Sequence, residues 1–224
     1  MAVIDFHAHV LPEMDHGCED VSMALRQLKA AKDAGIDIVI ATSHFYPQSE
    51  SIRSFLSRRE EAVQELKREI EKDKENRYPE VIPAAEVLLC DGMEHMEELS
   101  CLCIDGTAML LLEMPFSEWS ERTIDTLERL ENRKDLDIVL AHVERYSAEQ
   151  QDHILEMGYE VQVNSSFVRR FGARRSVRRF LKAEQVVALG SDIHGCKNGY
   201  RYFGKAYRFL VKNLVDFKEV KGKV

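Results

Sequence analysis

Hydrophobic and polar positions follow two different periods along the chain. Short apolar runs, typical of buried strands, are separated by segments in which apolar residues recur every three or four positions, which is typical of helices. The predicted strands are the segment that ends at Ile4 and the runs 36–41, 81–85, 108–112, 137–141, 159–163 and 186–189. The predicted helices extend over about 21–34, 49–73, 120–133, 147–157 and 173–183, and the stretch between 85 and 108 is helix or loop.

Start and stop signals mark some of these helices. Ser147 and Gln150 have the spacing of a capping box, in which each side chain bonds to the backbone of the other residue. Gly35 and Gly158 follow two of the predicted helices, where glycine ends a helix easily because it tolerates a left-handed backbone.

This alternation of strands and helices predicts a parallel sheet, which is either open or closed into a barrel. A nucleotide-binding open sheet would carry a G-x-G-x-x-G or G-x-x-x-x-G-K-[ST] motif after its first strand, and neither occurs there. No long linker and no internal repeat divides the 224 residues. We therefore expect an α/β barrel of about seven strands that forms a single domain over residues 1–224.

The composition is that of an ordinary globular protein, with 45% hydrophobic and 31% charged residues. A formal net charge of −8 argues against a general nucleic-acid binder, whose surface is normally basic. No apolar run reaches the roughly 18 residues of a membrane span, so no membrane span is predicted and a cytoplasmic location is expected.

Five cysteines are present, and reduced thiols are expected because their number is odd and none forms a C-x-x-C pair. They are Cys18, Cys90, Cys101, Cys103 and Cys196.

Residues that bind metals collect directly after the predicted strands. Six of the eight histidines lie there, together with acidic residues, an arginine and an asparagine. In chain order these residues are His7, His9, His16, His44, Glu86, Glu113, His142, Arg145, Asn164, Asp192 and His194. The carboxyl ends of all strands meet on one face of a parallel barrel, which is where active sites lie. The sequence therefore predicts one polar site on that face.

The residue types indicate metal chemistry. His7 and His9 are two positions apart in an extended segment, so their imidazoles point to the same side and can bind one ion together. Mixed imidazole and carboxylate ligands suit zinc, iron or manganese, and Glu86 or Glu113 can bridge two ions through its two oxygens. Two or three ions fit this set of ligands, and adjacent ions promote phosphoryl transfer by activating water near neutral pH. Arg145 adds a guanidinium that can bind two phosphate oxygens.

Each residue also has a purely structural interpretation. A histidine at a strand end is often a hydrogen-bonded structural residue, and we interpret His95 and His153, which lie off the pattern, in that way. Glu86 could pair with a buried arginine, Glu113 could cap the next segment, and Arg145 could bind a carboxylate. Taken together, however, these interpretations require repeated coincidence at the same structural position.

Seven short motifs carry a family resemblance. In chain order they are DFHAHVLPEMDHG (5–17), ATSHFYP (41–47), AAEVLL (84–89), LLEMP (111–115), LAHVERY (140–146), QVNSSF (162–167) and GSDIHG (190–195). The ordered set resembles the PHP (polymerase and histidinol phosphatase) superfamily, and within it the bacterial metal-dependent protein-tyrosine phosphatases of capsular and exopolysaccharide synthesis. The resemblance implies a distorted (β/α)7 TIM-like barrel with a three-metal centre at the carboxyl ends of its strands.

Carried over position by position, the resemblance implies three groups of ligands. They are His7, His9, Glu86 and Asp192 for the first ion, Glu86, Glu113 and His142 for the second, and His44, His194 and a residue of the segment 14–17 for the third.

The chain departs from that family at Asp15-His16-Gly17, where close relatives usually carry Asp-Asp-Gly. Other branches of the superfamily use histidine near this point, so we expect His16 to be the ligand, with Asp15 as the alternative. The family implies manganese, and the additional imidazole shifts the preference towards zinc or iron.

A second departure follows the GSDIHG motif. The resembled family has an arginine before a proline pair, whereas this chain continues as CKNGYRYFG, with Lys197 and Arg201 as its cations. Arg201 is therefore a candidate phosphate-binding residue at a different offset, in addition to Arg145.

The implied activity is hydrolysis of phosphotyrosine, with Arg145 and the ions stabilising charge on the phosphate oxygens. A phosphocysteine route is excluded because none of the five cysteines has an arginine six positions later. The implied substrate is the tyrosine-rich tail of a membrane-associated autokinase, which would place the protein in the cytoplasm near the membrane. The basic segment 169–179 could attract such a tail or an anionic membrane, or it could be a solvated helix face.

Three alternatives stay open. A small-molecule phosphatase, for example one acting on histidinol phosphate, would keep the metal chemistry, although ATSHFYP and AHVERY favour a tyrosine phosphatase. An amidohydrolase would need a metal-bridging lysine after the fourth strand, where this chain has Glu113. A non-catalytic metal-binding regulator of polysaccharide assembly would have lost ligands, whereas here one plausible ligand replaces another.

Overall fold

The structure is a computed structural model that describes residues 2–168, 171–195, 199–213 and 215–220, with the backbone alone at 171–174. Cys196, Lys197 and the start of the basic segment 169–179 therefore lie outside the described residues.

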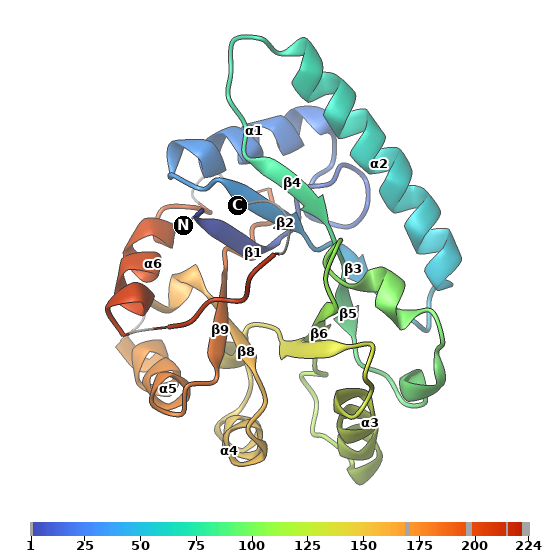
Figure 1. The fold of residues 1–224 in the computed structure, drawn as a ribbon, viewed down its shortest axis with the longest axis vertical. Coiled ribbons are helices and arrows are strands. Elements are labelled where there is room, and N and C mark those ends of the chain that lie inside the picture. The colour runs from blue at the N-terminus through green and yellow to red at the C-terminus, as the bar shows by residue number, and fades with distance from the viewer. Residues whose placement is uncertain (1, 169–170, 196–198, 214, 221–224) are drawn as a thin grey trace.

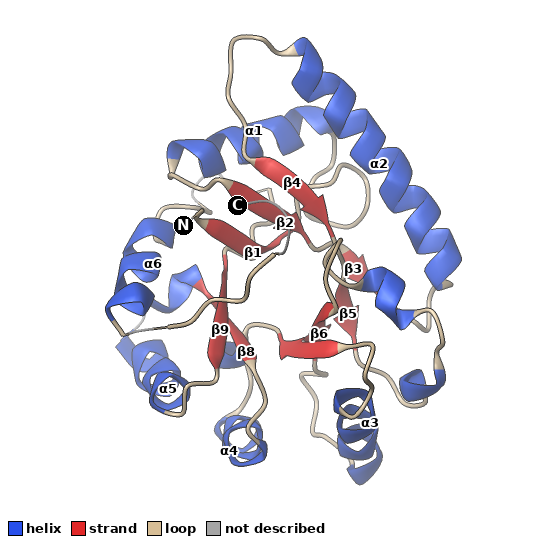
Figure 2. Cartoon of the chain, viewed as in Figure 1, coloured by secondary structure: helices blue, strands red, loops and turns tan. Residues whose placement is uncertain are grey.

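All strand pairs of the described chain are parallel, and the strands form two groups. The first group has the order β1 (Ile4–Ala8), β2 (Ile38–Ala41), β4 (Glu80–Pro83). The second has the order β3 (His44–Phe45), β5 (Glu86–Leu88), β6 (Met109–Glu113), β7 (Asp137–Leu140), β8 (Val161–Asn164), β9 (Val186–Gly190). Figure 2 shows the strands that it labels, β1–β6, β8 and β9, around a common centre.

Backbone hydrogen bonds join the two groups into one ring. β2 and β3 are parts of one bent strand, and β4 and β5 are parts of the next. The two bent strands stay hydrogen-bonded to each other through the bends: Ala84 N–H donates to Ala41 O at 2.9 Å, and Glu86 N–H donates to Ser43 O at 3.1 Å. On the other side, Asp192 N–H donates to His7 O at 2.7 Å, which ties the end of β9 to β1. The predicted α/β barrel of seven bent or straight strands is thereby confirmed among the described residues.

The helices lie outside this ring (Figure 1). They are α1 (Val21–Asp33), α2 (Ile52–Lys72), α3 (Glu121–Glu131), α4 (Ala148–Met157), α5 (Phe171–Lys182) and α6 (Phe203–Lys212). The predicted capping box of Ser147 and Gln150 is present, and Gly158 ends α4 with φ 78°. Short 3-10 turns cover 93–95, 99–102, 143–145 and 165–168. Among the described helices, none combines the length and the apolar character needed to cross a bilayer.

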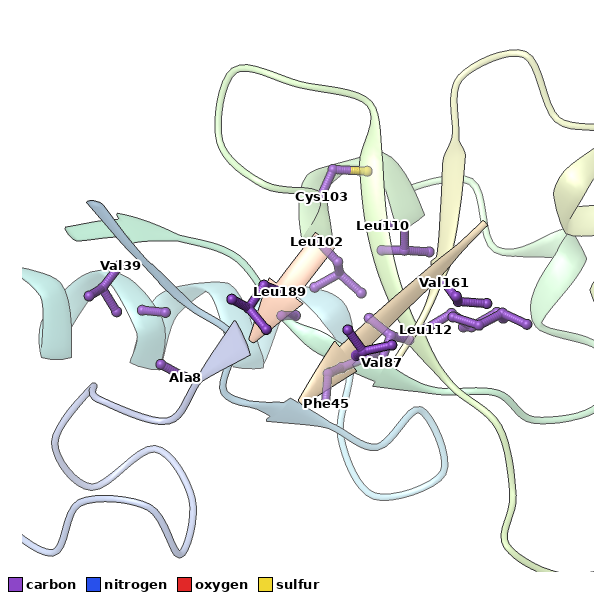
Figure 3. Close-up of a cluster of buried hydrophobic side chains, with 14 of the residues drawn as sticks. Ala8, Val39, Phe45, Val87, Leu102, Cys103, Leu110, Leu112, Val161 and Leu189 are labelled. Carbon is purple, nitrogen blue, oxygen red and sulfur yellow. The ribbon is translucent and has the colours of Figure 1, made fainter. Parts of the chain in front are cut away.

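Alternation along the strands separates two apolar layers. One fills the ring and includes Phe6, Ile40, Leu111, Val139 and Ala188. The other lies between the strands and the helices, and Figure 3 shows part of it, including Val39, Leu110, Leu112 and Leu189. Because both faces of the strands are covered, most strand positions are apolar, and the polar ones stand out.

Several predicted boundaries are wrong by a few residues. The first strand runs to Ala8, so His7 lies inside it, and Glu86 and Glu113 also lie inside strands. The helix α6 was not predicted, although its buried residues Phe203, Ala206 and Leu210 have helical spacing.

Candidate metal centre

A β-bulge in β1 turns both histidines of the His-x-His pair into the ring. Phe6 and His7 together face the single residue Ile40 of β2, which shifts the alternation of β1 by one position. Phe6 lies in the interior layer and Ala8 in the outer layer, so His7 and His9 lie on the interior side with Phe6. In a regular strand Phe6 and His7 would point to opposite faces, and the interior would receive only one of them.

Four potential ligand atoms from the ends of three strands converge inside the carboxyl end of the ring. His7 Nε2 lies 3.1 Å from His9 Nε2 and 3.1 Å from Glu86 Oε2, and His9 Nε2 lies 3.2 Å from the same oxygen. Asp192 Oδ1 is 3.6 Å from both imidazole nitrogens. Ligands bound to one ion at about 2.1 Å stand roughly 3–3.5 Å apart, so this group fits a divalent metal ion.

Glu86 also connects the first group to a second one. Its Oε1 lies 2.8 Å from His142 Nε2, which is 3.3 Å from Glu113 Oε1. His44 Nδ1 lies 3.1 Å from Glu86 Oε2, and His44, Glu86 and Glu113 form another potential metal-binding set. With its two oxygens directed to different histidines, Glu86 has the arrangement of a carboxylate shared between two ions.

A third set consists of His9, His44 and His194, whose ligand atoms lie within 4.8 Å of one another. The exposed ring of His16 stacks beside it, with ring centroids 4.4 Å from His194 and 5.1 Å from His44. His194 Nε2 is buried and makes no hydrogen bond to another described atom, as expected for an atom that awaits a ligand.

Asp15 serves a different purpose in this structure. Its Oδ2 accepts hydrogen bonds from His9 Nδ1 at 2.8 Å and from the His44 backbone N–H at 2.9 Å, while Oδ1 accepts from Gly17 N–H at 2.8 Å. A carboxylate on Nδ1 leaves Nε2 of His9 free to bind an ion. Of the two candidates at this point, Asp15 therefore orients a neighbouring ligand, and His16 lies beside the third set.

Gln162 is a site residue that sequence reasoning did not identify. Its Oε1 accepts from His7 Nδ1 at 3.0 Å and from His142 N–H at 2.8 Å. Its Nε2 donates to Asn164 Oδ1 at 2.9 Å, and the Asn164 amide donates to Asp192 Oδ2 at 2.9 Å. The alternation Val-Gln-Val-Asn in a buried strand was the available signal, because it directs both polar side chains to one face.

Electrostatics favour a proton on the two deepest histidines of the metal-free chain. Burial opposes protonation, but the carboxylates around them, Glu86 and Asp192 for His7 and Asp15 and Glu86 for His9, raise the pKa values to about 10 and about 9. Burial alone would likewise raise the pKa of Glu86, but the charge of His7 and the hydrogen bonds from the histidines hold it well below its ordinary value. An ion would replace these protons in the same position.

His44 and His194 behave in the opposite way. Burial lowers the pKa of both, and the nearby charge of His9 adds to the effect, so that the pKa of His194 falls to about 4. Both imidazoles are therefore neutral near pH 7, which is the form that binds metals.

The backbone is strained or crowded where the ligands meet. His142 and Asp192 have left-handed φ values of 34° and 52°, which are uncommon for residues other than glycine and concentrate at functional sites. A Cβ on Gly190 would lie 2.4 Å from His7 Cβ, and one on Gly17 would lie 2.3 Å from His9 Cβ. Only glycine allows these backbones to approach the histidines so closely.

The two predicted arginines lie in different surroundings. Arg145 Nη1 donates to Asp192 Oδ2 at 3.1 Å, and its guanidinium lies 4.8 Å from the ring centroid of Phe116, so it stands at the edge of the cluster. Arg201 is exposed, and its guanidinium lies 5.5 Å from the ring of its neighbour Tyr202. This conformation does not join Arg201 to the cluster.

Comparison with known proteins identifies the family. The family described as capsular polysaccharide synthesis, CpsB/CapC, matches residues 3–218. Tyrosine-protein phosphatase CpsB of Streptococcus pneumoniae is 26% identical over 232 residues, which cover 94% of this chain and 90% of that protein. Tyrosine-protein phosphatase YwqE of Bacillus subtilis is 28% identical over 225 residues, which cover 95% of this chain and 85% of that protein.

Solved structures agree on the fold. One from the study of YwqE and CpsB, described as unique metal-dependent tyrosine phosphatases, has a TM-score of 0.69 at 22% identity and covers 99% of both chains. A β-aspartyl dipeptidase of Fervidobacterium islandicum AW-1 has a TM-score of 0.51 at 13% identity over 96% of this chain and 70% of that chain. The family resemblance predicted from the seven motifs is confirmed: the chain belongs to the CpsB/CapC family of capsular polysaccharide synthesis.

Proposed function

We propose that this chain is a metal-dependent protein-tyrosine phosphatase, which hydrolyses the phosphate ester of a tyrosine side chain. The observation that carries the proposal is the convergence of His7, His9, Glu86 and Asp192 at 3.1–3.6 Å, with Arg145 beside them. The naming of the relatives CpsB and YwqE as tyrosine-protein phosphatases supports the class of substrate.

The three ligand groups would hold two or three divalent ions, with manganese as the first candidate and zinc or iron as alternatives. In this proposal the ligands are His7, His9, His16, His44, Glu86, Glu113, His142, Asp192 and His194, with Asp15 as the alternative to His16. Bound there, the ions would supply an activated water and positive charge for the phosphate oxygens.

The protein's own groups position the ligands and the substrate. Arg145 would bind phosphate oxygens, since its side chain is 47% exposed and its guanidinium is held by Asp192 and the ring of Phe116. Gln162 and Asp15 fix the orientation of His7 and His9, so that the ligand atoms need little rearrangement. Arg201 would have to change its conformation to take part, and its role stays a prediction.

The substrate that we propose is the phosphotyrosine tail of a membrane-associated autokinase. We propose further that the chain acts in the cytoplasm, near the membrane through this substrate, and that residues 1–224 form a single phosphoesterase domain.

The test begins with a metal analysis of the purified protein. Hydrolysis of a phosphotyrosine peptide and of histidinol phosphate is then measured with Mn²⁺, Zn²⁺ and Fe²⁺ added separately. We expect metal-dependent hydrolysis with the higher kcat/KM for the peptide. A preference for histidinol phosphate would identify a small-molecule phosphatase, and bound metal without hydrolysis of either compound would identify a metal-binding regulator.

The variant His7→Ala/His9→Ala removes two ligands of the first group. We expect at least about a hundredfold less hydrolysis together with lower metal content, because the remaining carboxylates offer an incomplete site. His95→Ala is the matched control, since the side chain of His95 is 75% exposed and lies outside the three sets. Full activity in the double variant would refute the proposed metal centre.

A further inference from the structure

Two of the four large apolar side chains on the described surface stand beside the metal centre. Tyr46 is 38% exposed and Phe116 is 53% exposed. The other two, Met157 and Val211, belong to helices α4 and α6 on the outside of the ring. Exposed apolar side chains that gather at one place mark a binding surface more often than scattered ones do.

Both rings lie nearly parallel to histidines of the cluster. Tyr46 stacks on His44 with ring centroids 5.3 Å apart and an interplanar angle of 19°. Phe116 stacks on His142 at 5.8 Å and 22°. His44 and His142 contact the two different oxygens of Glu86, at 3.1 Å and 2.8 Å. The two aromatic side chains therefore flank the carboxylate that would be shared between ions.

The strand order places these rings on two sides of β5, the strand that carries Glu86. Tyr46 directly follows β3 and Phe116 follows β6 by three residues, while β5, which carries Glu86, lies between those strands. Tyr46, Leu88 and Pro115 line a hollow of about 420 Å³, and Phe116 lines a second hollow of about 420 Å³. Each ring thus has room beside it that other side chains leave open.

We propose that Tyr46 and Phe116 bind the aromatic ring of the substrate and make this site selective for aryl phosphates over alkyl phosphates. The inference rests on the proposed phosphatase function and adds the residues that determine its specificity. In an aryl phosphate one oxygen separates phosphorus from the ring, so a phosphate bound by Arg145 and by the ions that Glu86 would share leaves that ring beside the two aromatic side chains. Offset stacking or edge-to-face contact would then stabilise it, whereas the methylene of phosphoserine offers no ring.

The experiment compares two peptides of one sequence that carry phosphotyrosine or phosphoserine at the same position. Tyr46→Ala and Phe116→Ala should each lower the ratio of the two kcat/KM values about two- to tenfold, mainly through KM, and the double variant should lower it further. Tyr46→Phe keeps the ring and should keep the ratio. Met157→Ala removes a comparably exposed apolar side chain from helix α4, on the outside of the ring, and should change neither kcat/KM value.

A binding measurement separates this inference from the proposed function. Calorimetry with phenylphosphonate and methylphosphonate reports on recognition of the ring without hydrolysis, and metal content is measured for every variant. We expect the alanine variants to lose the preference for phenylphosphonate over methylphosphonate while their metal content stays unchanged. This result is expected even if the natural substrate is not a protein.

Two outcomes would overturn the inference. One is an equal loss for both peptides in Phe116→Ala, which would mean that Phe116 acts only by holding Arg145. The other is an unchanged ratio in the double variant while phosphotyrosine hydrolysis continues, which would leave the phosphatase function intact and remove the role of the rings.

Discussion

Gln162 connects the ligands of several strands through one amide group. Its oxygen accepts from the His7 ring and from the His142 backbone, and its nitrogen leads through Asn164 to Asp192. Hydrogen bonds of this kind fix the tautomer and the rotation of a metal-binding imidazole and strengthen it as a ligand.

Replacing this amide tests that connection. In Gln162→Leu the side chain keeps its approximate size but cannot hold the His7 ring, so we expect metal affinity to fall about 10–100-fold while the fold is retained. Gln185→Leu is the control, because Gln185 is also buried but donates to the backbone oxygens of Ile154 and Tyr159. Metal titration and thermal unfolding distinguish them: the control should unfold at a lower temperature yet bind metal normally. Unchanged affinity in Gln162→Leu would contradict the role assigned to it.

Metal binding should release protons. His7 and His9 have pKa values of about 10 and about 9 in the metal-free chain, so at pH 7 both carry a proton that an ion has to displace. Apparent metal affinity should therefore rise with pH until these groups are deprotonated. Calorimetry in buffers of different ionisation enthalpy counts the released protons, and binding at pH 7 without release would contradict the raised pKa values.

The stability of the metal-free fold has the opposite dependence on pH. The pKa values of His7 and His9 are raised above the unfolded value of about 6.5, so the folded chain holds these two protons more tightly than the unfolded chain does. This contribution to the free energy of unfolding is complete below pH 6.5 and is lost as the pH rises through 9 to 10.

Sequence reasoning proposed metal ligands by residue type and did not identify Gln162, which holds the His7 ring. Histidines and glutamates at strand ends point to metal binding because few other roles explain their collection there. Gln162 is an amide in an apolar strand, and amides serve many purposes. Asp15 was the alternative to His16 as a ligand. Its carboxylate lies 2.8 Å from His9 Nδ1 in the folded chain, and the shape of the loop that sets this distance could not be predicted from the sequence.

At the level of the strands, close packing around β1 depends on glycine in β9. A Cβ at position 190 would lie 2.4 Å from His7 Cβ and 2.6 Å from Gln162 Nε2. Neither neighbour can move away easily, because His7 and Gln162 are themselves fully buried.

Gly190→Ala should therefore push His7 and Gln162 apart. We expect a loss of about 1–3 kcal/mol in the free energy of unfolding, as for other overpacked cores, together with weaker metal binding. Gly204→Ala is the control, since a Cβ there would lie 3.5 Å from the end of the Arg208 side chain in helix α6, where alanine is favoured over glycine. Chemical denaturation measures both, and wild-type stability in Gly190→Ala would mean that the strands can separate without loss.

The order of strands and helices could be predicted, whereas the bends and the bulge could not. Apolar runs mark the buried strands, but the breaks at Thr42–Ser43 and Ala84–Ala85 arise where strands curve to complete the ring. The bulge at Phe6 and His7 depends on the pairing with β2, which lies about thirty positions further along the chain. Local patterns contain no information on such pairings.

Across the whole molecule, the C-terminal segment covers the end of the barrel opposite the metal centre. Lys218 N–H donates to Val187 O at 3.0 Å, and Lys218 Nζ lies 2.9 Å from Asp137 Oδ2 and 2.6 Å from Glu160 Oε2. Val220, at 3% exposure, joins the apolar cluster inside the ring.

Val220→Ala should destabilise the protein without affecting its chemistry. Removing two buried methyl groups is expected to cost about 1–3 kcal/mol, or roughly 2–10 °C in Tm. Val211→Ala, at a 47% exposed position of helix α6, should change stability by less than about 0.5 kcal/mol. Thermal unfolding and metal titration check the pair, and reduced metal affinity in Val220→Ala at low temperature would show that the two ends of the barrel are coupled.

During synthesis, the two sides of the first ligand group leave the ribosome far apart in time. His7 and His9 are made first, and Asp192 follows His9 by 183 positions. The hydrogen bond from Ser191 N–H to the Asp5 carboxylate, which helps to hold β9 against β1, spans 186 positions. A nascent or truncated chain therefore lacks a complete set of ligands for this ion. Stable capture of this first ion should therefore begin only after Asp192 has left the ribosome and β9 has docked against β1.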